Sequence, residues 1–487
     1  MSIIGLDVGT SSIKAAAYGG DGSLLAAERA SLSPKRPQSG WETLNPEESW
    51  RATCWVLNQL AAHPSVRHDP PTSLAISASG DEVFPVDRNG IALDACLLSG
   101  DLRGDAIEAE TLKLASPETW VKECGHVPER MDPINRILWW RSQRPEIFQR
   151  TVQFLGWHEF LTFRLCRRAV TDPSLASKWL VYDLKTRTWS SEWLERLGLD
   201  VALLPEISPW ESPLATLLPE AAAETGLPEG LEVFPGAFDS TCAAVGAGVS
   251  TPHHAGLAWG SWQVLAAIVQ SLPTPEKTAA AGFPITPYPG RDKFAFLSQS
   301  PNGTSVLDWL ARSSGVEISE LEKQLPPPET GFAPVLSLPH FSGAINPWSA
   351  EGRSSRGGFL GLTLATAPAD LYRSVLESEV YELVISLESL RTLGVAPDIL
   401  RATGGGSRSR WWMQLTADLT GLVVEVADVP EAGTLGAARL AGLATDTAIN
   451  SLHRHEPNPG RAEIYSGRLD LYRAAVTGCL PFTRGLD

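Results

Sequence analysis

The sequence predicts a protein of two α/β domains, and three observations lead to that prediction. One residue pattern occurs twice, a domain apart, at residues 5–11 and again at residues 256–262. Three consecutive glycines, at residues 404–406, precede a helical pattern in the second half. The chain has 487 residues, 43% of them hydrophobic, so it is too long for one core and can fill two or three.

The first copy of the repeat is typical of a phosphate-binding turn between two strands. Residues 3–6 form an apolar run, and strand character resumes at residues 13–18. The turn between them carries the hydroxyls of Thr10, Ser11 and Ser12 and can offer backbone N–H groups to anionic oxygens. We therefore assign this turn to a phosphorylated cofactor.

The second copy differs from the first at one informative position. Ala258 stands where the first copy has Asp7, while Gly260 and Ser261 form the same kind of turn. One loop thus offers a carboxylate that can hold Mg²⁺ directly or through water, and the other offers only hydrogen-bond donors. This difference is expected if two half-molecules close on one metal-bound nucleotide. Two unrelated glycine turns are the alternative.

The glycine triplet predicts a site for a flat ligand. Gly404, Gly405 and Gly406, followed by Ser407, let a ligand such as a nucleotide base lie against bare backbone. A simple turn is the alternative. No Gly-Lys dipeptide occurs in the sequence, which excludes a phosphate loop of the Walker type.

The repeat also predicts the domain boundary. We expect a first domain over residues 1–248 and a second over residues 249–487, with a hinge in the small-residue stretch 246–255. Within the first domain, residues 46–62 have a helical pattern with acidic residues in the first turn, and residues 74–78 are apolar, as in a buried strand.

Asp239 is the candidate catalytic base. It follows the apolar segment 231–234, at a point where the pattern changes from strand to helix. A carboxylate there can accept the proton of a hydroxyl group while a phosphoryl group is transferred to that hydroxyl. An ordinary helix N-cap is the alternative interpretation, and one aspartate can fill both roles.

Taken together, these motifs resemble the FGGY family of carbohydrate kinases, within the superfamily of actin, hexokinase and the heat-shock chaperones. The resemblance runs almost end to end and rests on residues 7–12, 236–239, 260–261, 404–406, 357–362 and 370–377. The last two segments match the second signature of the family throughout. The first signature is approximate over residues 131–139, where Arg136 stands at the usual lysine.

The resemblance implies a fold, a reaction and cofactors. Each domain should be ribonuclease-H-like, as in the actin-like ATPases, with a central cleft between them. The first domain would bind the sugar and carry the base, and the second would bind the nucleotide. ATP and Mg²⁺ would be the cofactors, with Asp7 at the metal and with Lys14 and Gly303 added to the nucleotide contacts. The reaction would phosphorylate a terminal hydroxyl of a ketopentose such as xylulose, or of another ketose, polyol or sugar acid.

Candidate substrate contacts follow the predicted strand at residues 74–78. Gly80, Asp81 and Glu82 emerge where an open α/β sheet places its ligands, and carboxylates there can accept hydrogen bonds from sugar hydroxyls. The resemblance adds Trp41, Glu42, Asp101, Arg103 and Ser240. The chain lacks the Gln-Met-His-Gly of typical xylulose kinases and the Gln-Arg-Glu-Thr of glycerol kinases, so the choice of sugar stays open.

Composition excludes several classes of partner. The formal charge of -16 disfavours a nucleic-acid groove or an anionic membrane surface, because either needs a concentrated basic face. The six cysteines have no Cys-x-x-Cys spacing, so neither a disulfide framework nor a zinc site is indicated. No signal peptide and no apolar stretch of membrane-spanning length is seen, so we expect a cytoplasmic protein with a small-molecule sugar as its partner. A homodimer is compatible with these features.

Two alternatives from other functional classes stay open. One is a catalytically silent sensor of sugar or nucleotide with the same fold, and the presence of both Asp7 and Asp239 argues against it. The other is an ATP-driven interaction protein of the chaperone branch, whose ATPase activity would not need sugar. The complete second signature argues against that branch.

Overall fold

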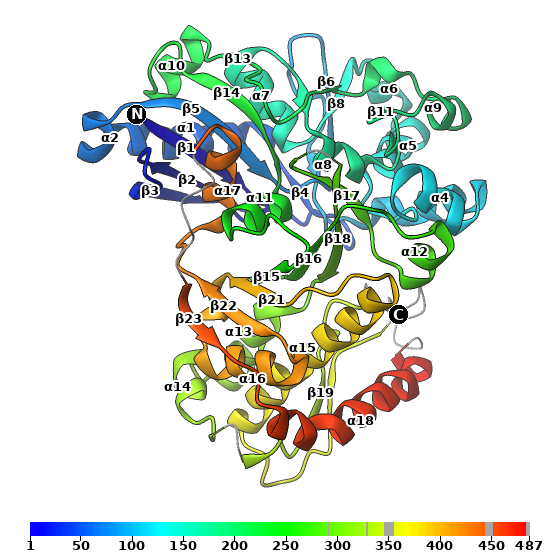
Figure 1. The fold of residues 1–487 in the computed structure, drawn as a ribbon. Helices are drawn as coiled ribbons and strands as arrows, with labels where there is room; N and C mark the ends of the chain where they lie inside the picture. Colours follow the sequence, from blue (N-terminus) through cyan, green and yellow to red (C-terminus); the bar gives the residue numbers. More distant parts are fainter. Residues whose placement is uncertain (291, 328–329, 345–354, 444–450, 484–487) are drawn as a thin grey trace. The chain divides into compact units, whose positions relative to one another are not determined.

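The computed structural model describes residues 1–290, 292–327, 330–344, 355–443 and 451–483 (Figure 1). The chain folds into two compact units. The first, which we call the N-terminal unit, consists of Met1–Gly248, Pro284–Phe294 and Glu431–Ala448. The second, the C-terminal unit, consists of Val249–Phe283, Ala295–Pro430 and Ile449–Asp487.

The main division falls between Gly248 and Val249, where the sequence analysis also places its boundary. A split into residues 1–248 and 249–487 nevertheless does not describe the chain fully. Pro284–Phe294 and Glu431–Ala448 pack with the N-terminal unit although they come late in the sequence.

A six-stranded mixed sheet forms the centre of the N-terminal unit, in the order β13-β14-β5-β1-β2-β3. β1, β5 and β14 are parallel neighbours, whereas β2, β3 and β13 pair antiparallel at the two sides. Residues of β1 and β5 are nearly all buried, which explains why the sequence shows continuous apolar runs there. The strands are β1 (Ser2–Val8), β2 (Ser12–Tyr18), β3 (Leu24–Ser31), β5 (Pro71–Ala78), β13 (Ala215–Thr216) and β14 (Glu232–Phe238).

The C-terminal unit repeats this arrangement, with its strands in the order β18-β16-β15-β21-β22-β23. β15 and β16 form an antiparallel hairpin, and β15, β21 and β22 are parallel, as are β1, β5 and β14 of the first unit. The hairpin β15–β16 followed by two parallel neighbours, as in β1–β2 with β5 and β14, is the structural counterpart of the repeated sequence pattern. The strands are β15 (His254–Trp259), β16 (Gln263–Val269), β18 (Lys293–Ser300), β21 (Ile399–Thr403), β22 (Val423–Ala427) and β23 (Ser451–His455).

Short strand pairs complete the N-terminal unit and one pair lies in the C-terminal unit. The former pairs are β4 (Thr43–Leu44) with β7 (Cys96–Leu97), β6 (Phe84–Val86) with β8 (Gln153–Leu155), β9 (Val170–Thr171) with β12 (Glu206–Ile207), and β10 (Tyr182–Asp183) with β11 (Thr188–Trp189). The latter is β19 (Leu336–Leu338) with β20 (Gly358–Leu360). β17 (Ile285–Tyr288) lies in the segment that returns to the N-terminal unit.

Helices cover the sheet of each unit. The predicted helix over residues 46–62 is confirmed as α1, and the predicted strand 74–78 lies within β5. The N-terminal unit contains α1 (Pro46–Ala62), α2 (Pro64–His68), α3 (Asp105–Thr111), α4 (Pro117–Cys124), α5 (Pro133–Gln143), α6 (Pro145–Phe148), α7 (Trp157–Cys166), α8 (Pro173–Ala176), α9 (Ser191–Leu197), α10 (Pro219–Thr225), α11 (Asp239–Gly246) and α17 (Ala432–Leu440). The C-terminal unit contains α12 (Pro275–Ala281), α13 (Gly303–Ser314), α14 (Ile318–Lys323), α15 (Pro368–Thr392), α16 (Arg410–Thr420) and α18 (Pro459–Thr483). None of the helices in the described ranges is long and apolar enough to cross a bilayer.

Helix α17 joins the N-terminal unit through close backbone contacts that only glycine permits. Figure 1 shows α17, in orange, beside the green α11 and the blue strands. A Cβ atom on Gly436 would overlap the carbonyl oxygen of Cys242 in α11, and one on Gly5 would overlap the carbonyl oxygen of Thr434. The late segment is therefore an integral part of the N-terminal unit.

Candidate functional site

Three predicted site residues stand at one edge of the N-terminal sheet. Asp7 lies near the end of β1, Asp81 follows β5, and Asp239 follows β14 as the first residue of α11. Because β1, β5 and β14 are parallel, their carboxyl ends meet at the same edge, which is where open α/β sheets bind ligands. Asp7, Asp81 and Glu82 are all close enough to Asp239 to act on its titration.

The pKa of the Asp239 carboxylate is in a range that suits a general base. Burial, followed by the negative charge of Asp7, raises its pKa to about 7, and the effect of Asp7 outweighs that of the Ser240 hydrogen bond, which lowers the pKa. Ser240 donates that bond through its Oγ at 3.1 Å and a second through its backbone N–H at 2.5 Å, both to Oδ1. A carboxylate with a pKa near the working pH combines ionisation with basicity.

Asp7 accepts a hydrogen bond and lies near a lysine that is itself ion-paired. Ser77 Oγ donates to Asp7 Oδ1 at 2.6 Å, and Lys14, opposite Asp7 on β2, pairs with Glu431 at 2.8 Å. Burial raises the pKa of Asp7, whereas the Ser77 bond and the charge of Lys14 lower it. A Cβ atom on Gly433 of α17 would lie 3.1 Å from Asp7 Oδ1, so a larger residue at 433 would press on this carboxylate.

This donor set fits Mg²⁺ better than it fits a metal held by protein alone. Among the described residues, no group of three or more His, Cys, Asp or Glu side chains is placed to hold a metal ion. Mg²⁺ is usually bound by one or two carboxylates together with substrate phosphates and water. Asp7 offers one such carboxylate, with Asp239 as a charged neighbour.

Asp81 and Glu82, both predicted to contact the substrate, have different environments. Asp81 pairs with the buried Lys178, with 3.2 Å between Oδ1 and Nζ. Glu82 is 1% exposed, burial raises its pKa to about 7, and neither of its carboxylate oxygens has a hydrogen-bond partner among the described residues. A Cβ atom on Gly80 would lie 3.0 Å from the Lys178 side chain, so a larger residue would push this lysine away.

Asp101 and Arg103 pack with Trp41 in the N-terminal unit. Arg103 Nη2 lies 2.7 Å from Asp101 Oδ2, and its guanidinium stacks 3.8 Å from the centre of the Trp41 ring. Asp101 is fully buried and also accepts the backbone N–H of Glu42 at 2.8 Å. Asp101 and Arg103 therefore help to position Trp41 and Glu42.

Trp41 and Glu42 line a cavity of about 590 Å³ in the N-terminal unit. Glu42 forms an ion pair with the exposed Arg36 at 2.6 Å on its rim. The lining residues are Arg36, Gln38, Ser39, Gly40, Trp41, Glu42, Gly100 and Leu102.

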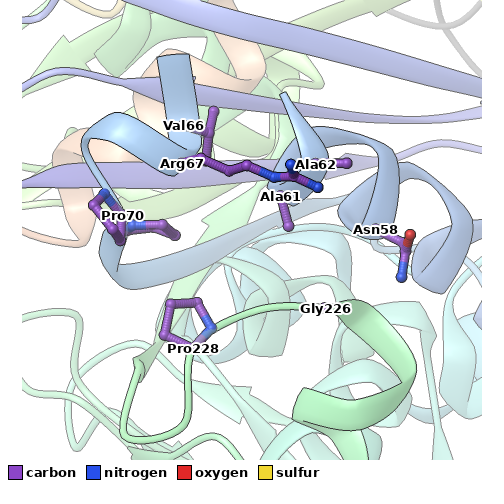
Figure 2. Close-up of a pocket in the computed structure, with 9 residues that line it drawn as sticks. Asn58, Ala61, Ala62, Val66, Arg67, Pro70, Gly226 and Pro228 are labelled. Atoms are coloured by element: carbon purple, nitrogen blue, oxygen red, sulfur yellow. The ribbon is translucent and has the colours of Figure 1, made fainter. Parts of the chain in front are cut away.

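A further cavity of the same unit contains no predicted site residue (Figure 2). It has a volume of about 420 Å³ and lies between the ends of α1 and α2 and the turn after α10. Its lining is mostly alanine and proline, with the polar side chains of Asn58 and Arg67.

Sequence reasoning missed Arg136 and Lys178 as residues that organise the site. The buried Arg136 donates to the carbonyl oxygens of Leu97 at 3.2 Å and Leu98 at 2.6 Å, and also to that of Asp81. It thus ties the loop after β5 to β7. The only sequence feature that marked Arg136 was its departure from the first family signature. No sequence feature marked Lys178 as a residue of the site.

The predicted nucleotide residues of the C-terminal unit come together. The turn of the β15–β16 hairpin accepts a hydrogen bond at Gly260 O from the backbone N–H of Thr304, at 2.8 Å. A Cβ atom on Gly303 would lie 2.6 Å from Gly260 O, and one on Gly404 would lie 2.6 Å from Trp259 O. Glycine at these positions lets the hairpin, the start of α13 and the triplet approach one another closely.

The indole rings of Trp259 and Trp412 pack against each other next to the glycine triplet. The rings of Trp259 and Trp412 are 4.1 Å apart, and a Cβ atom on Gly406 would lie 2.6 Å from the Trp412 ring. A Cβ atom on Gly405 would meet nothing within 4 Å, so this glycine faces open space. Ser407 closes the turn by donating its hydroxyl to Gly404 O at 2.8 Å.

The two repeated turns are similar but not identical in length. In the first, Val8 pairs with Ile13 across the hairpin and four residues, 9–12, form the turn. In the second, Trp259 pairs with Gln263 and three residues, 260–262, form the turn. Ser261 is therefore placed differently in its turn from Thr10, Ser11 and Ser12 in theirs.

Comparison with known families accounts for both units. The model for the N-terminal domain of the FGGY family of carbohydrate kinases matches residues 2–246, and the model for the C-terminal domain of that family matches residues 257–445. The chain belongs to the FGGY family of carbohydrate kinases. It is accordingly an enzyme of the carbohydrate kinase class, as the resemblance of its motifs predicts.

Relatives of this FGGY kinase match nearly its full length. A xylulose kinase of Klebsiella pneumoniae is 28% identical over 96% of this chain and 97% of the relative. A gluconokinase of Bacillus licheniformis is 25% identical over 96% of this chain and 94% of the relative. Proteins named for different sugars are thus similar to this chain to nearly the same degree.

The fold class is confirmed by solved structures. The crystal structure of a xylulose kinase from Brucella ovis superimposes with a TM-score of 0.88, covers 100% of both chains and is 24% identical. The predicted architecture of two ribonuclease-H-like domains, as in the actin-like ATPases, is therefore correct.

Proposed function

We propose that this FGGY kinase transfers the γ-phosphoryl group of ATP to a terminal hydroxyl of a ketopentose, with xylulose as the first candidate. The observation that carries the proposal is the carboxylate of Asp239 at the carboxyl edge of the N-terminal sheet, where burial and the neighbouring carboxylates raise its pKa to about 7. The xylulose kinases among the full-length relatives support the choice of sugar.

Asp239 accepts the proton of the sugar hydroxyl in this scheme. The hydroxyl oxygen then forms the new bond to the γ-phosphorus, while the bond from that phosphorus to the oxygen bridging to ADP breaks. Ser240 fixes the Asp239 carboxylate through two hydrogen bonds. Glu42, Asp81 and Trp41 are proposed to bind the sugar, together with Gly80, Glu82, Asp101, Arg103 and Ser240.

Asp7 would hold Mg²⁺, directly or through water. When bound, the ion neutralises negative charge on the phosphate oxygens. Burial raises the pKa of Asp7, and the Ser77 hydrogen bond and the charge of Lys14 act against that rise and so favour the ionised carboxylate that a metal ion needs. The proposed nucleotide contacts are Thr10, Ser11, Ser12 and Lys14 in the N-terminal unit and Gly260, Ser261, Gly303, Gly404, Gly405, Gly406 and Ser407 in the C-terminal unit.

A sugar panel read by ADP release tests the proposal. The panel contains D- and L-xylulose, other pentuloses and hexuloses, tetritols and gluconate, and phosphorus NMR of the product identifies the phosphorylated hydroxyl. We expect ADP formation that depends on a ketopentose and yields a terminal phosphate ester. ADP formation without any sugar would support the sugar-independent ATPase instead. Binding of sugar and ATP without any turnover would support the silent sensor.

A further inference from the structure

Lys178 contacts Asp81, in the loop proposed to bind the sugar, and lies near Phe238, the residue before the proposed base. It belongs to the 3₁₀ turn Ser177–Trp179 and is 6% exposed. Its ammonium is 3.2 Å from Asp81 Oδ1 and 5.6 Å from the centre of the Phe238 ring. Since Phe238 directly precedes Asp239, the lysine is placed between the loop after β5 and the start of α11.

The ammonium is charged despite its burial. Burial acts to lower the pKa of Lys178, but the carboxylates of Asp81, Glu129 and Asp132 outweigh that effect and raise the pKa. His126, which packs against Asp132 at 3.1 Å, adds a titratable neighbour on the same side. A buried cation in such a setting remains a hydrogen-bond donor at every pH at which the enzyme would work.

Lys178 retains donor capacity for a ligand. An ammonium group has three N–H donors, and within the described ranges Asp81 is the single carboxylate that lies within 4.0 Å of Nζ. The contrast with the neighbouring Arg136 is clear, because that guanidinium donates to three backbone carbonyls. Asp81 likewise keeps acceptor sites, since its Oδ1 forms no hydrogen bond with the described residues that meets ordinary geometry.

We propose that Lys178 and Asp81 form a specificity pair for the sugar, in which the ammonium donates to an oxygen of the substrate chain while the Asp81 carboxylate accepts from the adjacent hydroxyl. This inference rests on the proposed function and adds a substrate class to it, namely a neutral polyhydroxylated chain that carries a carbonyl or hydroxyl oxygen next to a second hydroxyl. Lys178 is a residue that no motif of the sequence assigns to binding.

Charge in the N-terminal site favours a neutral substrate over a sugar acid. Asp7, Asp81, Glu82 and Asp239 gather at one edge of the sheet, and their mutual repulsion already contributes to the raised pKa of Asp239. A substrate carboxylate beside Lys178 would add another negative charge to this group, with one ammonium to offset it. A keto oxygen or a hydroxyl accepts the same hydrogen bond without that repulsion.

The experiment compares Lys178→Met, Lys178→Arg, Asp81→Asn and the double variant Lys178→Met/Asp81→Asn with the wild-type enzyme. Lys113→Met is the matched control, because Lys113 forms an ion pair with Glu110 on the exposed surface of the same unit. For each protein we measure KM and kcat for xylulose, the corresponding pentitol and gluconate, KM for ATP, sugar affinity by calorimetry without nucleotide, and thermal unfolding.

The specificity pair predicts a selective loss of sugar recognition. Lys178→Met and Lys178→Arg should raise KM for the preferred neutral sugar by about 10-fold or more, as expected for a lost hydrogen bond to a charged group, with KM for ATP and the control unchanged. The double variant should remain as defective as the single ones. A purely structural ion pair predicts the opposite, because removing both charges together leaves none unpaired and would restore the wild-type KM.

Further outcomes keep this inference separate from the proposed function. If Lys178→Met does not fold, the KM of Lys178→Arg tests the inference. This variant retains the positive charge and the ion pair with Asp81 but changes the position of the N–H donors. Wild-type KM in a folded Lys178→Arg and in the double variant would overturn the inference while leaving the kinase activity intact. A wild-type enzyme that prefers gluconate to every neutral sugar would also overturn it. Absence of turnover with the whole panel would instead contradict the proposed function.

Discussion

Ser77 Oγ donates a hydrogen bond of 2.6 Å to Oδ1 of Asp7, between residues that stand opposite each other on the parallel strands β5 and β1. This bond lowers the pKa of Asp7, against the effect of burial, which raises it. An ionised Asp7 in turn raises the pKa of Asp239. The Ser77 hydroxyl therefore affects the pKa of Asp239, the proposed base, indirectly through Asp7.

Asp7→Ala should weaken use of Mg²⁺ and ATP far more than sugar binding. The variant removes the carboxylate proposed to hold the ion, while Glu42, Asp81 and Lys178 stay in place. We expect the Mg²⁺ concentration for half-maximal rate to rise by about 10-fold or more, with calorimetric sugar affinity within about 2-fold of wild type. Ser77→Ala should shift the Mg²⁺ requirement in the same direction but less. Lost sugar affinity with unchanged nucleotide affinity would place Asp7 in the sugar pocket.

Substitutions in the glycine triplet should separate folding from nucleotide binding. A methyl group on Gly406 meets the Trp412 ring at 2.6 Å, so Gly406→Ala should lower the unfolding temperature. A methyl group on Gly405 meets nothing within 4 Å, so Gly405→Ala should fold normally but occupy the space proposed for the base. We expect its ATP affinity to fall by about 10-fold, equivalent to ~1.4 kcal/mol. Unchanged ATP affinity in Gly405→Ala would remove the triplet from the nucleotide site.

Gly436→Ala should destabilise the N-terminal unit. Its methyl group would overlap the carbonyl oxygen of Cys242, and such overpacking costs about 1–3 kcal/mol of unfolding free energy. Gly467→Ala is the matched control, because Gly467 lies in α18 with nothing within 4 Å, and alanine should stabilise that helix by about 0.5–1 kcal/mol. Urea unfolding of both variants measures the difference. Equal stability of the two would show that α17 does not pack as described.

Residues close in sequence were predicted well, and residues brought together by long-range packing were not. The hairpin β1–β2, the strand β5 and the helix α1 follow from local periodicity, turn residues and an acidic first turn. The glycine triplet and Gly260 were assigned to one site because the family resemblance supplied their order, and the structure brings them together.

The segment 431–443 was not predicted to belong to the N-terminal unit. Its glycines suit close packing, but a sequence does not show which helix they pack against. Gly246 is an example, since the sequence analysis places it in a hinge and the structure packs it on the carbonyl of Ala432. The hinge itself stays a prediction. The pairing of Asp81 with Lys178 was missed for the same reason, because nearly a hundred residues separate them and neither lies in a spacing that marks a pair.

The central claim is that Asp239 accepts the proton of a sugar hydroxyl, and the pH dependence of kcat/KM for the sugar in wild-type enzyme and Asp239→Asn tests it most directly. Because the pKa of Asp239 is about 7, the wild-type rate should fall about tenfold per pH unit below that value, as the base becomes protonated. Asp239→Asn should lose at least ~100-fold in rate near pH 7.5, keep its ATP affinity and lack this acidic limb. Near-normal turnover in Asp239→Asn, or the same acidic limb in both proteins, would contradict the account.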